Sequence, residues 1–253
     1  MKRTGFSLVE LSIVLVILGL LVGGVLSGQS LIRAAELRAV TNEYQRYVTG
    51  VYAFRDKYFA LPGDMPYATN FWGTSANCPG TQTQGSTTPA TCNGNGDGVL
   101  YPSATSNEPF RLWQHLANAG LLEGSYSGVR SDTNDWATSR ANAPSSKVSS
   151  GVWFAWNQLV PWSGNAAWFD SNSGNRFDLG GLGTNGQPAT PIFRPEEVWN
   201  IDMKIDDGKP GMGKVLVVFW SDCTDATMSS QTNANYRLNV KNTACFITFP
   251  NVF

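Results

Sequence analysis

The sequence is poor in histidine and in charged side chains. His115 is the one histidine in 253 residues, which excludes sites that need several histidine ligands. No two of the four cysteines have the C-x-x-C spacing of zinc-binding or thioredoxin-like motifs. Charged residues make up 15% of the chain, against about 25% in ordinary soluble domains, and the net charge is −1. This balance gives no indication of a nucleic-acid partner.

Recognisable catalytic motifs are also missing. No serine lies in a nucleophile elbow, and no glycine-rich phosphate loop follows an expected strand. His115 lies in the apolar string "RLWQHL", where we expect it to pack against neighbours rather than act in catalysis. We therefore expect no enzymatic activity, although carboxylates from distant loops could still meet in the fold.

A long apolar run begins near the N-terminus. Phe6 to Leu26 is about 21 residues, and about 20 helical residues span the hydrocarbon core of a bilayer. Lys2 and Arg3 precede the run, which predicts that the N-terminus stays inside and the rest lies outside. The run is longer than the apolar core of a signal peptide and continues as helix, so we interpret it as a transmembrane anchor.

Glu10 interrupts this apolar run. An ionised carboxylate costs several kcal/mol in hydrocarbon unless it is paired. No cationic side chain follows it at helical spacing, because the chain has Ile13, Val14 and Ile17 there. Glu10 could lie at the inner interface or be protonated. Alternatively, cleavage after Gly5 would create an α-amine that pairs with Glu10 of a neighbouring subunit.

The string "KRTGFSLVELSIVLVILGLL" resembles the N-terminus of type IV pilins and pseudopilins. That family has a short basic leader ending in Gly, then Phe, then Glu at the fifth mature position, then a long apolar helix. The resemblance implies that a prepilin peptidase cuts between Gly5 and Phe6 and methylates the Phe6 amine. Glu10 would neutralise that amine in a neighbouring subunit. The implied partners are other pilin or pseudopilin subunits and an inner-membrane assembly platform.

The helix is expected to continue beyond the membrane as an aromatic stripe. Apolar and aromatic residues recur at alternating spacings of three and four, whereas the charged residues Arg33, Glu36 and Glu43 lie mostly off the stripe. Leu61-Pro62-Gly63 ends the pattern. A helix packed on its own globular domain explains the aromatics better than a coiled coil does. The stripe comprises Leu37, Val40, Tyr44, Tyr47, Val51, Phe54 and Tyr58.

The rest of the chain predicts an α+β head. Residues 109–122 have the pattern of an amphipathic helix, and residues 163–191 are expected to form a connection rich in Gly, Asn and Pro. Strands are expected in "GVWFAWNQLV", "GKVLVVFW", "YRLNVK" and "ACFITFP". The expected fold is one long helix laid on an antiparallel sheet with large loops. It agrees with the pilin-like fold that the N-terminus implies.

This organisation divides the chain into four parts. We expect a leader at 1–5, a transmembrane half-helix at 6–26, a periplasmic half-helix at 27–60, and a globular head at 61–253. The resemblance places the precursor in a bacterial inner membrane with its head in the periplasm. From there it would pass into a periplasmic pseudopilus or an extracellular pilus.

The four cysteines fit an exported head. The simplest pairing is sequential, Cys78 with Cys92 and Cys223 with Cys245, although four cysteines allow three pairings and the sequence does not choose among them. Each short closed loop would contribute about 3 kcal/mol in the chain-entropy model. The second pair resembles the disulfide-bounded loop near the end of many type IV pilins.

Two acidic loops are candidate calcium sites. Asn93, Asn95 and Asp97, followed by Gly98, resemble the start of an EF-hand loop. The first position is Asn and the twelfth is Ala104, so a complete EF-hand is excluded, and a Gly/Asn turn is the alternative. The second loop, in "NIDMKIDDGKPG", offers Asp202, Asp206 and Asp207, again with a turn as the alternative.

Tryptophans cluster in the middle of the chain. Trp153, Trp156, Trp162 and Trp168 lie within 16 residues of one another. They could stack on a glycan if exposed, or pack in the core if buried.

Taken with the N-terminal resemblance, the sequence predicts a structural subunit of a type IV pilus or type II secretion pseudopilus. The alternative is a minor tip subunit whose Trp-rich head binds a glycan, a surface or a secreted substrate. An anchored enzyme would need a cleft of convergent polar groups.

Overall fold

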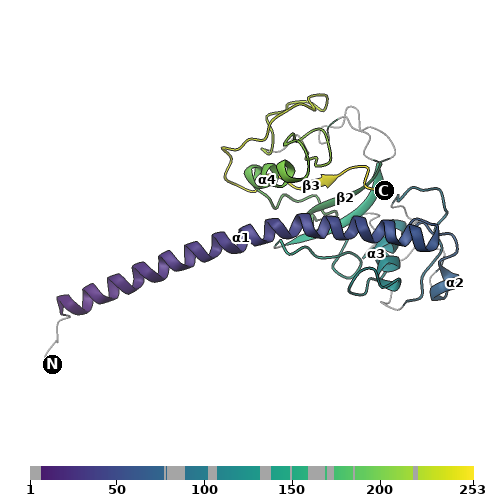
Figure 1. Ribbon diagram of the computed structural model, residues 1–253, viewed down its shortest axis with the longest axis horizontal. Coiled ribbons are helices and arrows are strands. Elements are labelled where there is room, and N and C mark those ends of the chain that lie inside the picture. Colours follow the sequence, from purple (N-terminus) through teal and green to yellow (C-terminus); the bar gives the residue numbers. More distant parts are fainter. Residues whose placement is uncertain are drawn as a thin grey trace.

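One long helix organises the molecule, and a head is built around the C-terminal half of that helix (Figure 1). The computed structural model describes residues 7–76, 78, 89–101, 107–131, 138–148, 150–158, 169, 174–184, 186–218 and 222–253. Its elements in chain order are α1 (Leu8–Tyr58), α2 (Thr69–Trp72), α3 (Glu108–Asn118), β1 (Gly151–Gln158), β2 (Gly174–Gly181), α4 (Pro195–Ile205) and β3 (Ile247–Phe249).

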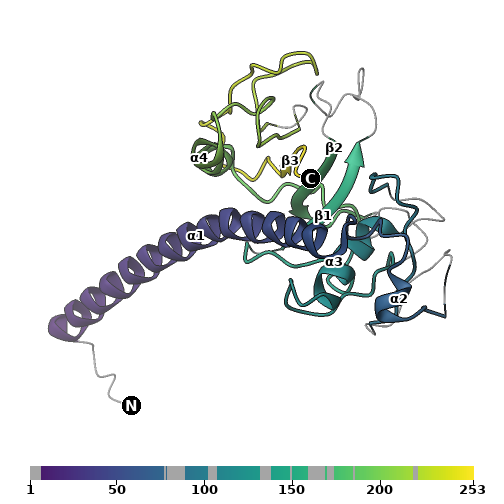
Figure 2. The ribbon, with the colours of Figure 1, turned by 45° about the vertical axis from the view of Figure 1, so that its right-hand side comes forward.

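Helix α1 is continuous over 51 residues, which corresponds to about 77 Å at 1.5 Å per residue. Ser7 caps its N-terminus, because its Oγ accepts the Val9 N–H at 3.3 Å. The helix ends where Phe59 adopts a left-handed conformation, with φ of 52°, and donates its N–H to the Arg55 carbonyl. The N-terminal half projects away from the head in both views (Figures 1 and 2).

The expected aromatic stripe is the face of α1 that the head covers. Four of its members are buried, namely Val40, Tyr47, Val51 and Phe54, and the other three are partly buried against the same core. The spacing of three and four places these side chains in one row, so a single domain can cover them all. The stripe therefore marks the half of α1 that belongs to the head.

The sheet is antiparallel and packs directly on the stripe. Its strand order is β1-β2-β3, with Trp153 opposite Leu179 and Phe177 opposite Phe249. The Tyr44 ring stacks on Phe249 with centroids 4.2 Å apart. These contacts confirm an α+β fold in which a long helix lies on a small antiparallel sheet.

The opposite face of the sheet is also buried, but it carries polar groups. Asp178 is fully enclosed there and accepts hydrogen bonds from Trp156 Nε1 at 2.6 Å and from Thr248 Oγ1 at 2.9 Å. The Arg176 guanidinium lies 3.8 Å from the centre of the Trp156 ring and pairs with Asp178. The sheet is thus an inner layer covered on both faces.

The central strand of this sheet was not expected. Residues 163–191 were expected to be a connection, yet they contain β2. The strand was missed because Gly174, Gly180 and Gly181 weaken the strand pattern of the sequence. The structure needs a glycine at 180, since a Cβ there would collide with the Pro188 carbonyl. The expectation was wrong because close backbone approach, rather than side-chain propensity, selects glycine at that position.

Two expected strands are wrong in the described part of the chain. In "GKVLVVFW", residues Val215 to Val218 are buried as expected, but in the described residues they form isolated bridges, such as that between Leu216 and Thr248, and no continuous strand. In "YRLNVK", Tyr236 makes a single bridge to Thr224, and turns follow it. The apolar residues of this segment are buried by packing in the head and not by pairing in a continuous strand. Phe219 and Trp220 lie outside the described residues.

The helix expected over 109–122 forms as α3 and ends four residues earlier, at Asn118.

On this helix, His115 is fully buried between two hydrogen bonds: its Nδ1 accepts the Gly63 N–H at 3.0 Å, and its Nε2 lies 3.0 Å from Thr91 Oγ1. Its ring also stacks on Phe54. Burial, assisted by the nearby Arg111 charge, lowers the pKa of His115 to about 3. His115 is therefore a neutral link between α3, the end of α1 and the loop at Thr91.

We predict that His115 stays neutral in the folded chain when the pH is lowered from 8 to 5. Its folded pKa lies below the ordinary value near 6.5, so the unfolded chain takes up the proton first. The stability contributed by neutral His115 is therefore complete above pH 6.5 and is lost progressively as the pH falls toward 3. The single histidine gives one imidazole signal, whose NMR shift should not move over this range. A midpoint near pH 6.5 would contradict this buried arrangement.

Candidate functional site

The exposed N-terminal half of α1 is the most unusual surface of the chain. Every large apolar side chain from Leu8 to Leu26 is exposed, as are Leu31 and Ile32. Among the described residues, α1 is the helix long and apolar enough to cross a membrane. Water is a poor solvent for so large an apolar surface, so a bilayer or other protein must cover it.

Glu10 lies on this exposed segment and caps its own helix. Its Oε2 accepts the Ser7 N–H at 2.9 Å, while Ser7 Oγ accepts the Val9 N–H. The two residues form a capping box that holds the carboxylate over the first turn of α1. Gly5 and Phe6 lie outside the described residues, so cleavage and methylation there remain predictions.

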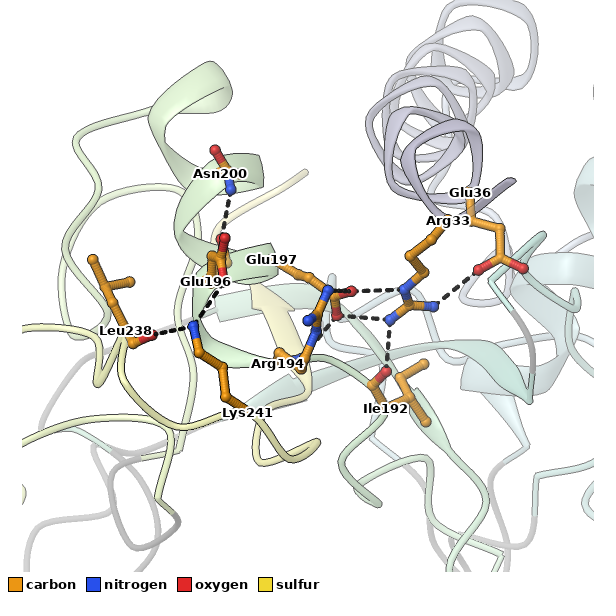
Figure 3. Close-up of polar contacts among 9 residues, drawn as sticks. All are labelled: Arg33, Glu36, Ile192, Arg194, Glu196, Glu197, Asn200, Leu238 and Lys241. Atoms are coloured by element: carbon orange, nitrogen blue, oxygen red, sulfur yellow. Dashed lines mark hydrogen bonds and ion pairs between the residues drawn. The ribbon is translucent and has the colours of Figure 1, made fainter. Parts of the chain in front are cut away.

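A cluster of ionic contacts marks where α1 enters the head (Figure 3). Arg33 donates from Nε and Nη2 to the two carboxylate oxygens of Glu197 on α4, at 2.8 and 2.7 Å. It also donates to Glu36 on its own helix and to the Ile192 carbonyl, at 2.9 and 3.0 Å. One guanidinium thus joins α1 to α4 and to the segment before α4. We call these contacts the Arg33 cluster.

Glu197 is the acceptor at the centre of the Arg33 cluster. It also receives the Arg194 N–H at 2.9 Å and Arg194 Nη2 at 3.0 Å, so its buried carboxylate is surrounded by donors. Burial raises the pKa of Glu197, but the hydrogen bonds from Arg33 and Arg194 outweigh it and lower the pKa overall. Glu197 therefore remains ionised, and the Glu197 contact in turn raises the pKa of Arg33.

A carboxylate on α1 itself, about three turns beyond Arg33, also fixes the helix to the head. Glu43 is buried and accepts Trp153 Nε1 at 2.8 Å, Ser146 Oγ at 2.7 Å and the Lys147 N–H at 2.8 Å. The sequence analysis placed Glu43 and Arg33 off the stripe. The spacing itself could have found them, because Arg33 is four residues before Leu37 and Glu43 lies between Val40 and Tyr47.

Both sequential disulfides are present. Cys78 joins Cys92, with Cα atoms 5.5 Å apart, and Cys223 joins Cys245, with Cα atoms 5.2 Å apart. Cys245 also pairs with Phe193 through backbone hydrogen bonds, just before α4. The second disulfide therefore attaches a C-terminal loop to the segment that carries the Arg33 cluster.

The first candidate calcium loop is folded as a turn. Asn93 Oδ1 accepts the Thr69 N–H, Asn95 Oδ1 accepts the Asp97 N–H, and Asp97 Oδ1 accepts the Val99 N–H. Asp64, which the sequence analysis missed, accepts the N–H groups of Gly96 and Gly98. Protein donors thus occupy oxygens that calcium would need. These contacts favour the turn, and calcium binding in this loop stays a prediction.

Two of the four clustered tryptophans are core residues. Trp153 is fully buried with its Nε1 on Glu43, and Trp156 is buried with its Nε1 on Asp178. Neither ring is available as a glycan platform, so the binding-surface interpretation is wrong for these two residues. Trp162 and Trp168 lie outside the described residues.

A cleft of about 760 Å³ opens at the C-terminal end of α1. Aromatic side chains line it, and Phe59 is 89% exposed there. Several polar groups in the cleft are already bonded to backbone: Tyr52 and Tyr67 donate to carbonyls, and Asp64 accepts N–H groups. The cleft therefore offers rings and a charged rim rather than a convergent catalytic group. Its other lining residues include Arg55, Asp56, Asn175 and Phe253.

Residues 1–26 match the family model described as the prokaryotic N-terminal methylation motif. Comparison with curated proteins and with solved structures finds no significant match. The motif and the exposed helix that follows it support a type IV pilin- or pseudopilin-like protein. They are consistent with membrane anchoring and indicate a structural subunit rather than an enzyme. The motif also implies processing by a prepilin peptidase and assembly with other pilin subunits.

We predict that Arg33→Ala loosens the junction between α1 and the head. The substitution removes four hydrogen bonds, two of them to the buried Glu197, and should lower the free energy of unfolding by about 1–3 kcal/mol. Hydrogen exchange of the backbone around residues 33–40 should become faster. Lys241→Ala is the matched control, because its pair with Glu196 is largely exposed and worth at most about 1 kcal/mol. Equal effects of the two substitutions would contradict a stabilising role of the Arg33 cluster.

Proposed function

We propose that this chain is the precursor of a filament subunit of a type IV pilus or a type II secretion pseudopilus. The observation that carries the proposal is the methylation motif over residues 1–26, which continues without a break into an exposed apolar helix. In this proposal the leader is 1–5, the helix spans the inner membrane over 6–26, and the head at 61–253 lies in the periplasm. Cleavage after Gly5 and methylation of Phe6 prepare the chain for assembly.

The apolar half of α1 serves two environments in succession. In the bilayer, lipid covers its side chains, and Glu10 can reach water at the inner interface. In a filament, the same side chains pack against neighbouring helices, where water is excluded. The same apolar side chains can therefore be covered first by lipid and then by neighbouring subunits. What changes is the demand on Glu10, whose carboxylate then needs a cationic partner.

The capping contact of Glu10 supports this pairing with a cation. Its carboxylate accepts the Ser7 N–H, and Ser7 directly follows Phe6 in the sequence. The Phe6 amine of a cleaved chain is positively charged near neutral pH, since an ordinary α-amino pKa is about 7.7–8.0. A neighbouring subunit shifted along its axis presents the same amine to Glu10. Pairing between subunits then replaces the capping contact within one chain.

A minor tip subunit is the second candidate function. It shares the N-terminal processing and assigns recognition of a glycan, a surface or a secreted substrate to the head. The cleft beside Phe59 favours this candidate, because exposed rings with a charged rim are the groups that stack on and orient sugars. The cleft lies at the opposite end of α1 from the membrane segment. This proposal places recognition there rather than at Trp153 and Trp156.

We predict that Glu10→Gln blocks assembly while membrane insertion stays intact. Loss of one partner from a buried ion pair costs about 3–5 kcal/mol, so the chain recovered in sheared filaments should fall at least about tenfold. The amount in the membrane fraction should stay the same, because glutamine suits an apolar segment at least as well.

Ser7→Ala is the matched control for this experiment. It removes the other half of the capping box and keeps the Glu10 carboxylate, so assembly should stay within about twofold of the native chain. Normal filaments in Glu10→Gln would contradict pairing between subunits. An equal loss in both variants would show that helix capping, and not pairing, is what assembly requires.

A further inference from the structure

Three carboxylates converge where α4 ends, away from the assembly helix. Asp202 lies in the last turns of α4, Asp206 follows its final residue, and Asp207 begins the next loop. One oxygen from each side chain lies within 4.8 Å of the others. No ion pair reaches any of the three within the described residues. Carboxylates this close repel one another when they are ionised, and this repulsion alone would not favour such an arrangement.

Asp202 supplies an independent observation that points to a ligand. The residue is completely buried, and its Oδ2 accepts the Tyr236 hydroxyl at 2.8 Å. Its Oδ1 is buried and has no hydrogen-bond partner, although the Gly208 backbone N–H also stabilises the carboxylate. A buried carboxylate oxygen without a partner costs free energy, and a cation bound by the acidic cluster to which Asp202 belongs would remove that cost.

The neighbouring loop holds the other two carboxylates in place. Asp206 Oδ2 accepts the Lys214 N–H, and Asp207 Oδ1 accepts the Lys209 N–H at 2.8 Å. Gly213 has a φ of +84°, and a Cβ there would collide with the Asp206 carboxylate, so the backbone passes close to it. Each aspartate thus has one oxygen engaged by the chain and a second oxygen available.

The chemistry and the spacing of the oxygens favour calcium among the common cations. Calcium binds carboxylate oxygens at about 2.3–2.6 Å, so two oxygens on one ion lie at most about 5 Å apart. Magnesium binds at about 2.0–2.1 Å, which limits that separation to about 4.2 Å and demands stricter geometry. Separations within 4.8 Å are compatible with calcium, whose flexible coordination tolerates them better than the strict octahedral geometry of magnesium does.

We propose that Asp202, Asp206 and Asp207 form a calcium site that ties the end of α4 to the loop closed by Cys223 and Cys245. Tyr236 lies in that loop and reaches the site through Asp202. The other end of α4 carries Glu197, the acceptor of the Arg33 cluster. A bound ion would stabilise both contacts of α4 at once.

The test is calcium titration of the full chain in detergent after treatment with a chelator, followed by calorimetry. We expect one binding site with a Kd between about 10⁻⁶ and 10⁻³ M, a higher Tm in calcium than in chelator, and magnesium binding at least about tenfold weaker. Absence of calcium binding up to about 10 mM, well above the Kd range of extracellular calcium modules, would overturn the proposal.

Matched substitutions assign the ion to its site. Asp207→Asn keeps the oxygen that accepts the Lys209 N–H on an exposed residue, so the variant should fold, and it should weaken calcium binding at least about tenfold. Asp97→Asn, in the other acidic loop, should leave the Kd unchanged. The reverse result, with binding lost in Asp97→Asn and kept in Asp207→Asn, would place the ion at residues 93–98 and overturn this assignment.

Discussion

The structure depends on one constraint: the apolar surface of the first half of α1 must be covered by something other than water. Each Val, Leu or Ile side chain gains about 1.5–3 kcal/mol when it is fully buried, and the first half of α1 exposes a continuous series of them. The chain does not fold back to cover these residues. The head forms only around the second half and leaves the first half free for lipid or for other subunits (Figure 1).

The change from exposed to covered helix takes place within two turns. Ile32 is 64% exposed and Val40 is fully buried, and Arg33 lies at the start of this interval. The Arg33 cluster and Glu43 attach α1 to the head by directional hydrogen bonds, whereas the aromatic stripe supplies the buried area. Packing gives the head its stability, and the two charged residues add directional contacts near the point where the free helix leaves it.

The sequence predicted the parts of the molecule that have a strong period or a terminal motif. The apolar run, the stripe and the N-terminal motif with Glu10 each rest on local spacing, which a single sequence displays directly. The strand β2 and the helix α4 were missed. Glycine in β2 is selected by the approach of Pro188, and α4 begins at Pro195 within an acidic segment that resembled a loop. The contacts of Arg33 with Glu197 and of Trp153 with Glu43 join residues more than 100 positions apart, so no local pattern contains them.

The most direct test of the account is the mass of the N-terminal peptide from the native membrane or sheared-filament fraction. The motif over residues 1–26 and the free helix together predict a peptide that begins at Phe6 and carries one methyl group on its amine. That result would leave only the choice between pilus and pseudopilus. A peptide that still begins at Met1 or Lys2 would contradict processing, and Glu10 would then have no amine to pair with.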